Sequence, residues 1–218
     1  MGFINGIKRK FLQLFQGRIN SKNRKRLIPT NEPRTIISSN CNGGFISHYL
    51  GLRFESPTVN LFIKPTDFIK ALNDFDKYFA PDAEIEEIKG EKDYPVGMLC
   101  GDVKIYFMHY DSFENAVEKW RERAKRINKN QLYVMMSERD GCTYEDLESF
   151  DKLPFESKVV FTHKQYHEIK SCYYIKGFEN KGCVGELQLS MNILGKRYID
   201  QFDYVSFLNR GEKEKINF

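Results

Sequence analysis

Polar side chains follow four predicted core strands, at the point where each strand ends. In chain order these groups are Asn40, Cys41 and Asn42 after residues 35–39, His109 and Asp111 after residues 103–108, Glu138 and Asp140 after residues 132–136, and Thr162 and His163 after residues 157–161. In open α/β sheets, ligands bind in the crevice outside the carboxyl ends of the strands. If the four strands are parallel neighbours, the polar groups converge there and form a candidate site.

His109 and Asp140 are the candidate catalytic residues of this site. An imidazole takes up a proton near neutral pH, so His109 is a candidate general base. It could instead bond the backbone and hold the strand-to-helix turn. Asp140 precedes Gly141, a pair that is equally typical of a plain turn. Cys41 would be a nucleophile if a helix N-terminus favoured its thiolate, and a buried structural cysteine is the alternative.

A turn of small residues, Asn-Cys-Asn-Gly-Gly at positions 40–44, joins the first strand to a short predicted helix. This arrangement points backbone N–H groups and a helix N-terminus at an anion. Neither GxGxxG nor a Walker lysine is present, and the glycines could equally serve a tight turn. The candidate ligand-binding residues of this turn are Asn40, Cys41, Asn42, Gly43 and Gly44.

No metal site is predicted, and the sequence indicates no particular cofactor. His163, a further candidate ligand-binding residue, has the spacing of a metal pair with His167, but no third ligand lies nearby in the sequence. Asp74 and Asp76 match the DxD spelling of many metal-dependent glycosyltransferases, yet helical spacing would place them about 200° apart. The five cysteines include no CxxC pair, which argues against a zinc knuckle or a disulfide framework.

The central element is a strand at residues 103–108 that leads into a long basic helix. Asp111 and Glu114 predict a capping box at the start of this helix. The helix carries Arg121 and Arg126, which could bind phosphate groups or pair with neighbouring glutamates on a charged outer face. Its apolar stripe, at helical spacing, is Phe113, Ala116, Val117, Trp120, Ala124 and Ile127.

The remaining pattern predicts an α/β fold with a mixed, largely parallel sheet flanked by helices. Further strands are expected at 59–63 and in a hairpin of 96–100 with 103–108, and further helices at 65–79, 143–150, 164–171, 185–194 and 198–208. The expected organisation is a basic amphipathic arm and linker at residues 1–32 and a single domain at residues 33–218.

The arm carries the positive charge of the chain. Residues 1–34 hold nine Lys or Arg against Glu32, a net charge of +8, so the rest of the chain has a net charge of −4. Residues 1–17 have the amphipathic pattern of a helix that lies on an anionic membrane surface; a helix docked on its own domain is the alternative. Residues 18–34 are predicted to be a linker.

Because the body is acidic and has no recognisable nucleic-acid module, nucleic acid is not an expected partner. No spanning segment or secretory signal is evident, so a cytoplasmic location, peripheral at the inner membrane face, is expected.

Four segments resemble a bacterial domain-of-unknown-function family whose members are often labelled exopolysaccharide biosynthesis proteins. They are TIISSNCNGG, SPTVNLFIKPTDFIK, FMHYDSFENAVEKWRERAKRIN and LPFESKVVFTH, and the resemblance covers about residues 33–210. It implies an α/β structure and an association with capsule or surface-glycan assembly, without a proven activity. It marks as motif positions, with no role attached, Asn40, Cys41, Gly43, Gly44, His109, Tyr110, Trp120, Arg121 and Arg126.

Two functions follow from these observations. The first is a transferase-like enzyme that acts on a sugar donor, a nucleotide-sugar or a lipid-linked glycan, at the cytoplasmic membrane face; glycosyl and acyl transfer both remain open. In it, the turn at 40–44 binds a phosphate or sugar, His109 is the base, and Arg121 or Arg126 offsets diphosphate charge. The second is a non-catalytic scaffold or regulator of a glycan-assembly complex, which requires a sizeable exposed patch.

Overall fold

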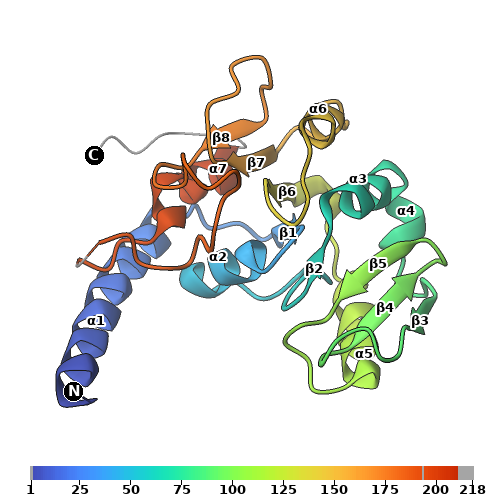
Figure 1. Ribbon diagram of the computed structural model, residues 1–218, viewed down its shortest axis with the longest axis horizontal. Helices are drawn as coiled ribbons and strands as arrows, with labels where there is room; N and C mark the ends of the chain where they lie inside the picture. Colours follow the sequence, from blue (N-terminus) through green and yellow to red (C-terminus); the bar gives the residue numbers. More distant parts are fainter. Residues whose placement is uncertain (1, 193, 211–218) are drawn as a thin grey trace.

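The computed structural model describes the backbone of residues 2–192 and 194–210, and the side chains of residues 12–192 and 194–209. Two four-stranded sheets form the framework of a mixed α/β domain flanked by helices (Figure 1). The parallel sheet has the order β1 (Thr35–Ser38), β6 (Leu132–Ser137), β7 (Lys158–Thr162) and β8 (Cys172–Tyr174). The antiparallel sheet has the order β2 (Phe62–Ile63), β5 (Val103–Tyr106), β4 (Val96–Leu99) and β3 (Ile85–Glu87).

The α/β class is therefore confirmed, but the parallel and antiparallel strands form separate sheets rather than one mixed sheet. The predicted hairpin is present as β4 and β5, with Val96 opposite Tyr106 and Leu99 opposite Val103. The second predicted strand is reduced to β2, which pairs with β5. The Ile63 N–H also donates to the Ser39 carbonyl at 2.9 Å, so β2 bridges the end of β1 to the antiparallel sheet.

Seven α-helices and two 3₁₀ turns connect the strands within the described part of the chain. They are α1 (Gly2–Arg26), α2 (Asn42–Leu50), α3 (Pro65–Asn73), α4 (Phe75–Tyr78), α5 (Phe113–Ala124), η1 (Lys129–Gln131), α6 (Tyr144–Asp151), η2 (Tyr198–Gln201) and α7 (Tyr204–Arg210). Local chemistry sets several starts: Pro65 occupies the first turn of α3, and Thr143 with Asp146 forms a capping box on α6. Helix α5 is capped by the Ser112 hydroxyl, one residue after the predicted cap Asp111.

The parallel sheet separates two apolar cores because its side chains alternate between its faces. Ile37, Val134 and Val160 face a core shared with α3, α5, α6 and the antiparallel sheet. Ile36 and Met135 face the other core, which α2 and α7 cover. The fully buried Trp120 of α5 belongs to the first core, as its position in the apolar stripe predicts.

The helices predicted at residues 164–171 and 185–194 are wrong. In the second segment the backbone carbonyls bond a neighbouring stretch instead of their own helix: the Leu187 carbonyl accepts from Ile199 N–H at 2.8 Å, and the Leu189 carbonyl from Tyr198 N–H at 3.1 Å. In the first segment, the Ser171 N–H donates to the Asp151 carboxylate at 2.7 Å. The apolar spacing resembles that of a helix in both places, but tertiary hydrogen bonds replace the helical ones.

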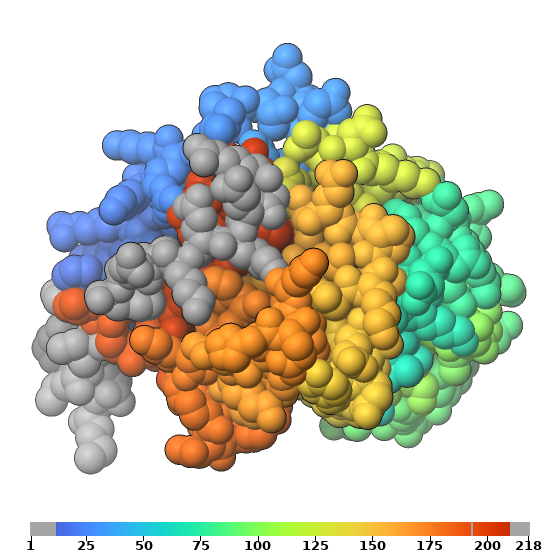
Figure 2. Space-filling model, turned by 90° about the horizontal axis from the view of Figure 1, so that it is seen from above, coloured from blue at the N-terminus to red at the C-terminus, as the bar shows by residue number. Residues whose placement is uncertain are grey.

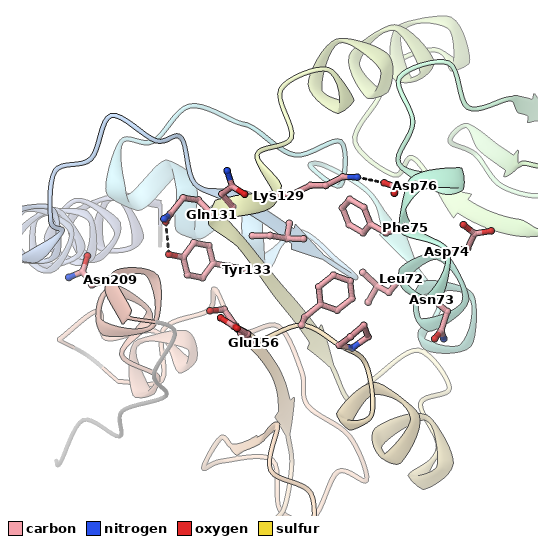
Figure 3. A pocket seen from close by; sticks show the side chains of 15 residues that line it. Leu72, Asn73, Asp74, Phe75, Asp76, Lys129, Gln131, Tyr133, Glu156 and Asn209 are labelled. Carbon is pink, nitrogen blue, oxygen red and sulfur yellow. Dashed lines mark hydrogen bonds and ion pairs between the residues drawn. The ribbon is translucent and has the colours of Figure 1, made fainter.

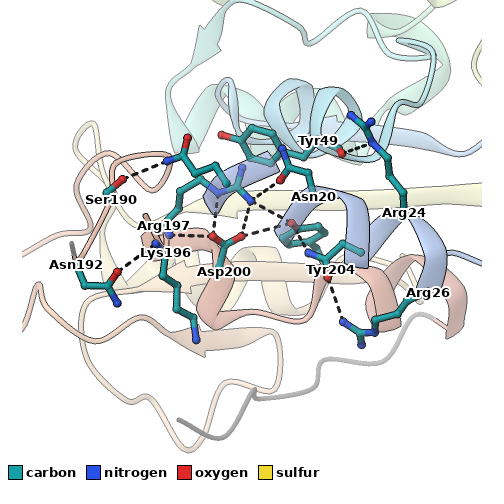
Figure 4. Close-up of polar contacts among 12 residues, drawn as sticks. Asn20, Arg24, Arg26, Tyr49, Ser190, Asn192, Lys196, Arg197, Asp200 and Tyr204 are labelled. Atoms are coloured by element: carbon teal, nitrogen blue, oxygen red, sulfur yellow. Dashed lines mark hydrogen bonds and ion pairs between the residues drawn. The ribbon is translucent and has the colours of Figure 1, made fainter. Parts of the chain in front are cut away.

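The part of helix α1 from residue 12 to residue 26 docks on the body. Residues 18–26, predicted as linker, continue the helix to Arg26. Asn23 donates to the Tyr204 hydroxyl at 2.7 Å. Arg24 donates to the Tyr49 carbonyl at 2.8 Å (Figure 4). In the space-filling view the blue N-terminal segment adjoins the red C-terminal one (Figure 2). Gln16 donates to the Ser190 hydroxyl at 3.2 Å, so the docked-helix alternative holds for residues 12–17, whereas the side chains of residues 1–11 lie outside the described residues.

A buried arginine lies at the centre of this docking surface. Arg197 is 1% exposed and makes a two-pronged contact with Asp200, at 2.9 Å and 2.7 Å (Figure 4). Its guanidinium stacks on the Tyr49 ring at 3.6 Å and donates to the Asn20 side chain of α1 at 2.8 Å. Across the described backbone, no helix combines the length and the apolarity that crossing a bilayer requires.

Candidate functional site

A small crevice lies where the carboxyl ends of β1 and β6 meet the start of α2 and the residues that follow the carboxyl end of β5. Its volume is about 130 Å³. The lining residues are Asn40, Cys41, Asn42, Phe45, Phe62, Met108, His109, Arg139, Asp140, Glu186 and Gln188. Three of the four predicted polar groups thus contribute to one site. His109 reaches it from the antiparallel sheet, so the convergence does not require four parallel neighbours.

Two asparagine side chains form the fixed wall of the crevice. The Ser137 hydroxyl at the end of β6 accepts from Asn40 Nδ2 at 3.0 Å and from Asn42 Nδ2 at 3.1 Å. The side-chain oxygen Oδ1 of Asn40 in turn accepts from the Asn42 backbone N–H at 3.1 Å and so satisfies the first N–H of α2. Because both amides are held in place, this wall presents oriented amide groups to a ligand.

The two glycines of the turn allow close packing. A Cβ on Gly43 would lie 2.9 Å from the Ser38 Cβ, and one on Gly44 would lie 3.3 Å from a Val59 methyl group. Neither glycine has a positive φ angle. Both are buried behind the crevice wall and do not line the crevice, so they position α2 against β1.

Cys41 is a poor nucleophile in this setting. Burial, reinforced by the Glu186 carboxylate, raises the pKa of its thiol to about 11. The thiol therefore stays protonated at neutral pH, where a thiolate would be needed for attack. It points to the Leu61 carbonyl, with the sulfur and oxygen 3.7 Å apart.

The opposite rim carries a charged group of three residues. Arg139 Nε donates to Asp140 at 3.1 Å, and Arg139 Nη1 donates to Glu186 at 3.1 Å. One guanidinium faces two carboxylates, so this rim has a net negative charge. Asp140 adopts a left-handed backbone with φ of 58°, which aspartate tolerates better than most side chains.

His109 lies exposed on the rim formed by β5. Among the described residues, neither of its ring nitrogens has a hydrogen-bond partner, and its neighbour Met108 is 39% exposed. Its side chain is therefore available to a ligand in the crevice. Asp111, expected beside it, is exposed and does not line the crevice.

His163 and Glu138 form a separate buried cluster beside the crevice. Glu138 Oε2 accepts from the His163 backbone N–H at 2.8 Å and contacts its Nδ1 at 2.7 Å. The Tyr166 hydroxyl donates to the other oxygen of Glu138. Burial and then this bond raise the pKa of Tyr166. The cluster ties the ends of β6 and β7 together, and His163 does not line the crevice.

Three other candidate residues also lie away from the crevice. The Tyr110 hydroxyl donates to the Val59 carbonyl at 2.9 Å and accepts from Arg123 at 2.6 Å. Arg126 pairs with Glu122 at 2.7 Å and with Glu55 at 3.4 Å. Arg121 is exposed on the outer face of α5. Arg121 and Arg126 therefore lie outside the crevice and cannot offset the charge of a diphosphate bound there.

Several lining residues were not predicted from the sequence. Arg139 stands between two predicted residues, so its position was a usable signal. Glu186 and Gln188 come from the segment wrongly predicted as a helix, which removed any reason to place them here. Phe45 and Phe62 fall in a predicted helix and a predicted strand, and nothing in their spacing pointed to the crevice. In the described residues, no group of three His, Cys, Asp or Glu side chains could hold a metal ion.

Comparison with known proteins identifies a family. A family model with the description "Domain of unknown function (DUF1919)" matches residues 10–209. An "Uncharacterized protein" of Haemophilus influenzae is 47% identical over 180 residues, which cover 83% of this chain and 86% of that protein. The family match starts within α1, whereas the sequence resemblance was expected to exclude residues 1–32. The docked helix is therefore largely included in the matched unit.

Proposed function

We propose that this chain, which belongs to the family described as "Domain of unknown function (DUF1919)", is a transferase-like protein of surface-polysaccharide assembly. In this proposal the crevice holds one sugar residue of a nucleotide-sugar or a lipid-linked glycan. The polysaccharide context rests on the sequence resemblance described above. The proposal that the chain binds a sugar rests on the side chains that line the crevice.

The observation that carries the proposal is the combination of side chains in the crevice. Fixed amides, two carboxylates and a guanidinium supply donors and acceptors for sugar hydroxyls. Phe45 and Phe62 supply apolar ring surface on which the C–H face of a sugar can pack. A few oriented polar groups beside aromatic surface are typical of small-molecule sites.

The volume and the charge of the crevice further restrict the part of the ligand that it can hold. The crevice has a volume of about 130 Å³, whereas sites for drug-sized ligands have roughly 300–1,000 Å³. One sugar ring fits this size better than a whole nucleotide-sugar. Because Arg139 is already paired with Asp140 and Glu186, the diphosphate or lipid carrier would extend outside the crevice.

His109 is the general base in this proposal. It lines the same crevice as Asn40 and Asn42, and its ring is exposed to an incoming acceptor. It would take the proton of the acceptor hydroxyl as the acceptor oxygen bonds to the anomeric carbon of the sugar. The bond from that carbon to the diphosphate breaks, and the nucleoside or lipid diphosphate leaves outside the crevice, while the amides and Asp140 hold the transferred sugar. Cys41 takes no covalent role, because burial keeps its thiol protonated.

The proposed location is the cytoplasmic face of the inner membrane. The supporting observation is that Arg18, Lys22 and Lys25 of α1 are exposed. A cationic helix is attracted to anionic lipid. Docking of residues 12–26 on the body would then hold the domain close to that surface.

A thermal-shift screen of the full chain tests the proposal. The panel contains nucleotide-sugars, acyl-CoAs and plain nucleotides, each with and without Mg²⁺ or Mn²⁺. A ligand at 100 times its Kd adds about 2.7 kcal/mol, or roughly 5–10 °C for a domain of this size. The expected result is a shift with nucleotide-sugars that His109→Ala or Asn40→Ala reduces and the exposed control His167→Ala retains. A shift that is equal in all three variants, or no shift at all, would contradict the proposal.

A non-catalytic scaffold is the second candidate. It is favoured by leucines that remain exposed on α1 and on the segment beside it: Leu14 is 67% exposed, Leu189 57% and Leu194 54%. Substitution of these leucines by serine would abolish assembly with the glycan machinery if the scaffold function is correct. The transferase proposal instead predicts that His109→Ala stops glycan production while assembly persists.

A further inference from the structure

A second and larger groove lies at the opposite end of the parallel sheet (Figure 3). It is formed by residues 72–76, 129–133 and 154–157 together with Asn209, at the amino ends of β6 and β7. Its volume is about 790 Å³, within the range of roughly 300–1,000 Å³ that is usual for ligand sites. We call it the amino-end groove. The amino-end groove shares no residue with the crevice, so ligand binding in the groove is independent of the proposed function.

Three polar side chains of the amino-end groove are available to a ligand. Asp74, Asn130 and Glu156 are exposed, and among the described residues their side chains make no hydrogen bond or ion pair. They come from different walls: Asp74 from the α3–α4 junction, Asn130 from η1 and Glu156 from the loop before β7. A ligand in the groove would therefore meet polar groups on several sides.

Other groove residues are held in place by the fold. The Tyr133 hydroxyl donates to the Leu208 carbonyl at 2.6 Å and lies 3.0 Å from Gln131 Oε1. These contacts hold the Tyr133 ring and the Gln131 side chain in place. Lys129 pairs with Asp76 across the groove (Figure 3). The wall is therefore partly organised before any ligand arrives.

The groove also contains aromatic surface. Phe75 and Phe155 are half-buried, with ring centroids 6.0 Å apart and ring planes inclined at 59°. Such rings can pack against the C–H faces of sugar rings. Planar amides and carboxylates beside them match the hydroxyl groups of a sugar, which both donate and accept.

Charge decides against an anionic ligand. Lys129 is the one cation among the described lining residues, against Asp74, Asp76 and Glu156. A phosphate, a nucleotide or an acidic glycan would meet this excess of carboxylates. A neutral polyhydroxylated ligand satisfies the polar groups and is not repelled.

We propose that the amino-end groove binds a neutral oligosaccharide. Amide shifts of the ¹⁵N-labelled full chain would be recorded with the hexaoses of maltose, cellulose and chitin type. Hexagalacturonate serves as the anionic comparison and hexalysine as the cationic peptide comparison. At least one neutral hexaose is expected to shift residues 72–76, 129–132 and 154–157 saturably, and hexagalacturonate is expected to bind these residues more weakly.

Variants assign the effect to named side chains. Asn130→Ala removes one exposed amide, and Phe155→Leu removes the ring face while it keeps an apolar side chain. Each is expected to weaken binding roughly two- to tenfold, whereas the exposed control Asn180→Ala leaves it unchanged. The proposal is overturned if no neutral hexaose shifts the groove signals at millimolar concentration, if hexalysine alone does so, or if neither variant weakens binding. Shifts confined to residues 40–45 and 186–188 would likewise overturn it while supporting the crevice.

Discussion

Substitution of Asp200 by asparagine is expected to destabilise the whole domain. Asp200 is 4% exposed, and its carboxylate accepts from Arg197 Nε, Nη2 and backbone N–H. Asp200→Asn removes the charge and points an NH₂ group at these donors, so the buried guanidinium loses its counter-charge. Loss of one partner of a buried ion pair costs about 3–5 kcal/mol, which corresponds to a fall in Tm of roughly 6–20 °C at this chain length.

Thermal and urea unfolding of the full chain measure this effect. Lys119→Ala is the control, because the Lys119 side chain is 40% exposed and pairs with Glu122, which is 46% exposed; such exposed pairs contribute little to stability. The double variant Arg197→Met/Asp200→Asn is expected to be more stable than Asp200→Asn alone, since it removes the unpaired charge. A loss below about 1 kcal/mol for Asp200→Asn, or a double variant less stable than the single one, would refute the reasoning.

Three further predictions concern packing, reactivity and pH. Gly43→Ala is expected to cost about 1–3 kcal/mol in urea unfolding because its Cβ meets Ser38 at 2.9 Å, whereas Gly17→Ala, with nothing within 4 Å, is expected to be neutral or stabilising. Iodoacetamide at pH 7.5 is expected to label the exposed Cys183 much faster than Cys41, whose pKa is raised to about 11; equal rates, followed by mass spectrometry, would contradict the burial argument. Burial raises the pKa of Asp203, but the hydrogen bonds from Arg26 and Ser206 outweigh burial and lower this pKa below its ordinary value. The stability that Asp203 contributes is therefore present above about pH 4 and is lost as the pH falls toward the folded pKa. The stability difference between wild type and Asp203→Asn should shrink across that window, and a constant difference would contradict the linkage.

Local signals in the sequence predicted the elements whose hydrogen bonds are local. Pro65 and Thr143 mark helix starts that depend only on the next few residues. Gly101, with φ of 80°, permits the tight turn of the β4–β5 hairpin. Trp120 lies in the core because the apolar stripe of α5 has one buried face.

Elements that depend on distant partners were not predictable in this way. The segment at 185–194 has helical spacing, yet its carbonyls bond residues 198 and 199, and no local pattern indicates this. Residues 18–26 have the composition of a linker, but contacts from Asn20 and Asn23 to the C-terminal segment hold them as helix. Residues 40–42, His109 and Asp140 could be predicted as members of one candidate site, because each follows a predicted strand. Glu186 and Gln188 could not, because only the folded path of the chain places them beside the crevice.

The most direct test of the sugar-binding crevice is saturation-transfer difference NMR with free monosaccharides and the full chain. Glucose, galactose, mannose, N-acetylglucosamine and N-acetylgalactosamine are titrated separately against wild type, Asn42→Ala and the exposed control Asn180→Ala. Sugar binding in the crevice predicts saturation transfer to the ring protons of at least one sugar, lost in Asn42→Ala and kept in Asn180→Ala. Absence of transfer to all five sugars, or equal transfer in Asn42→Ala, would contradict it.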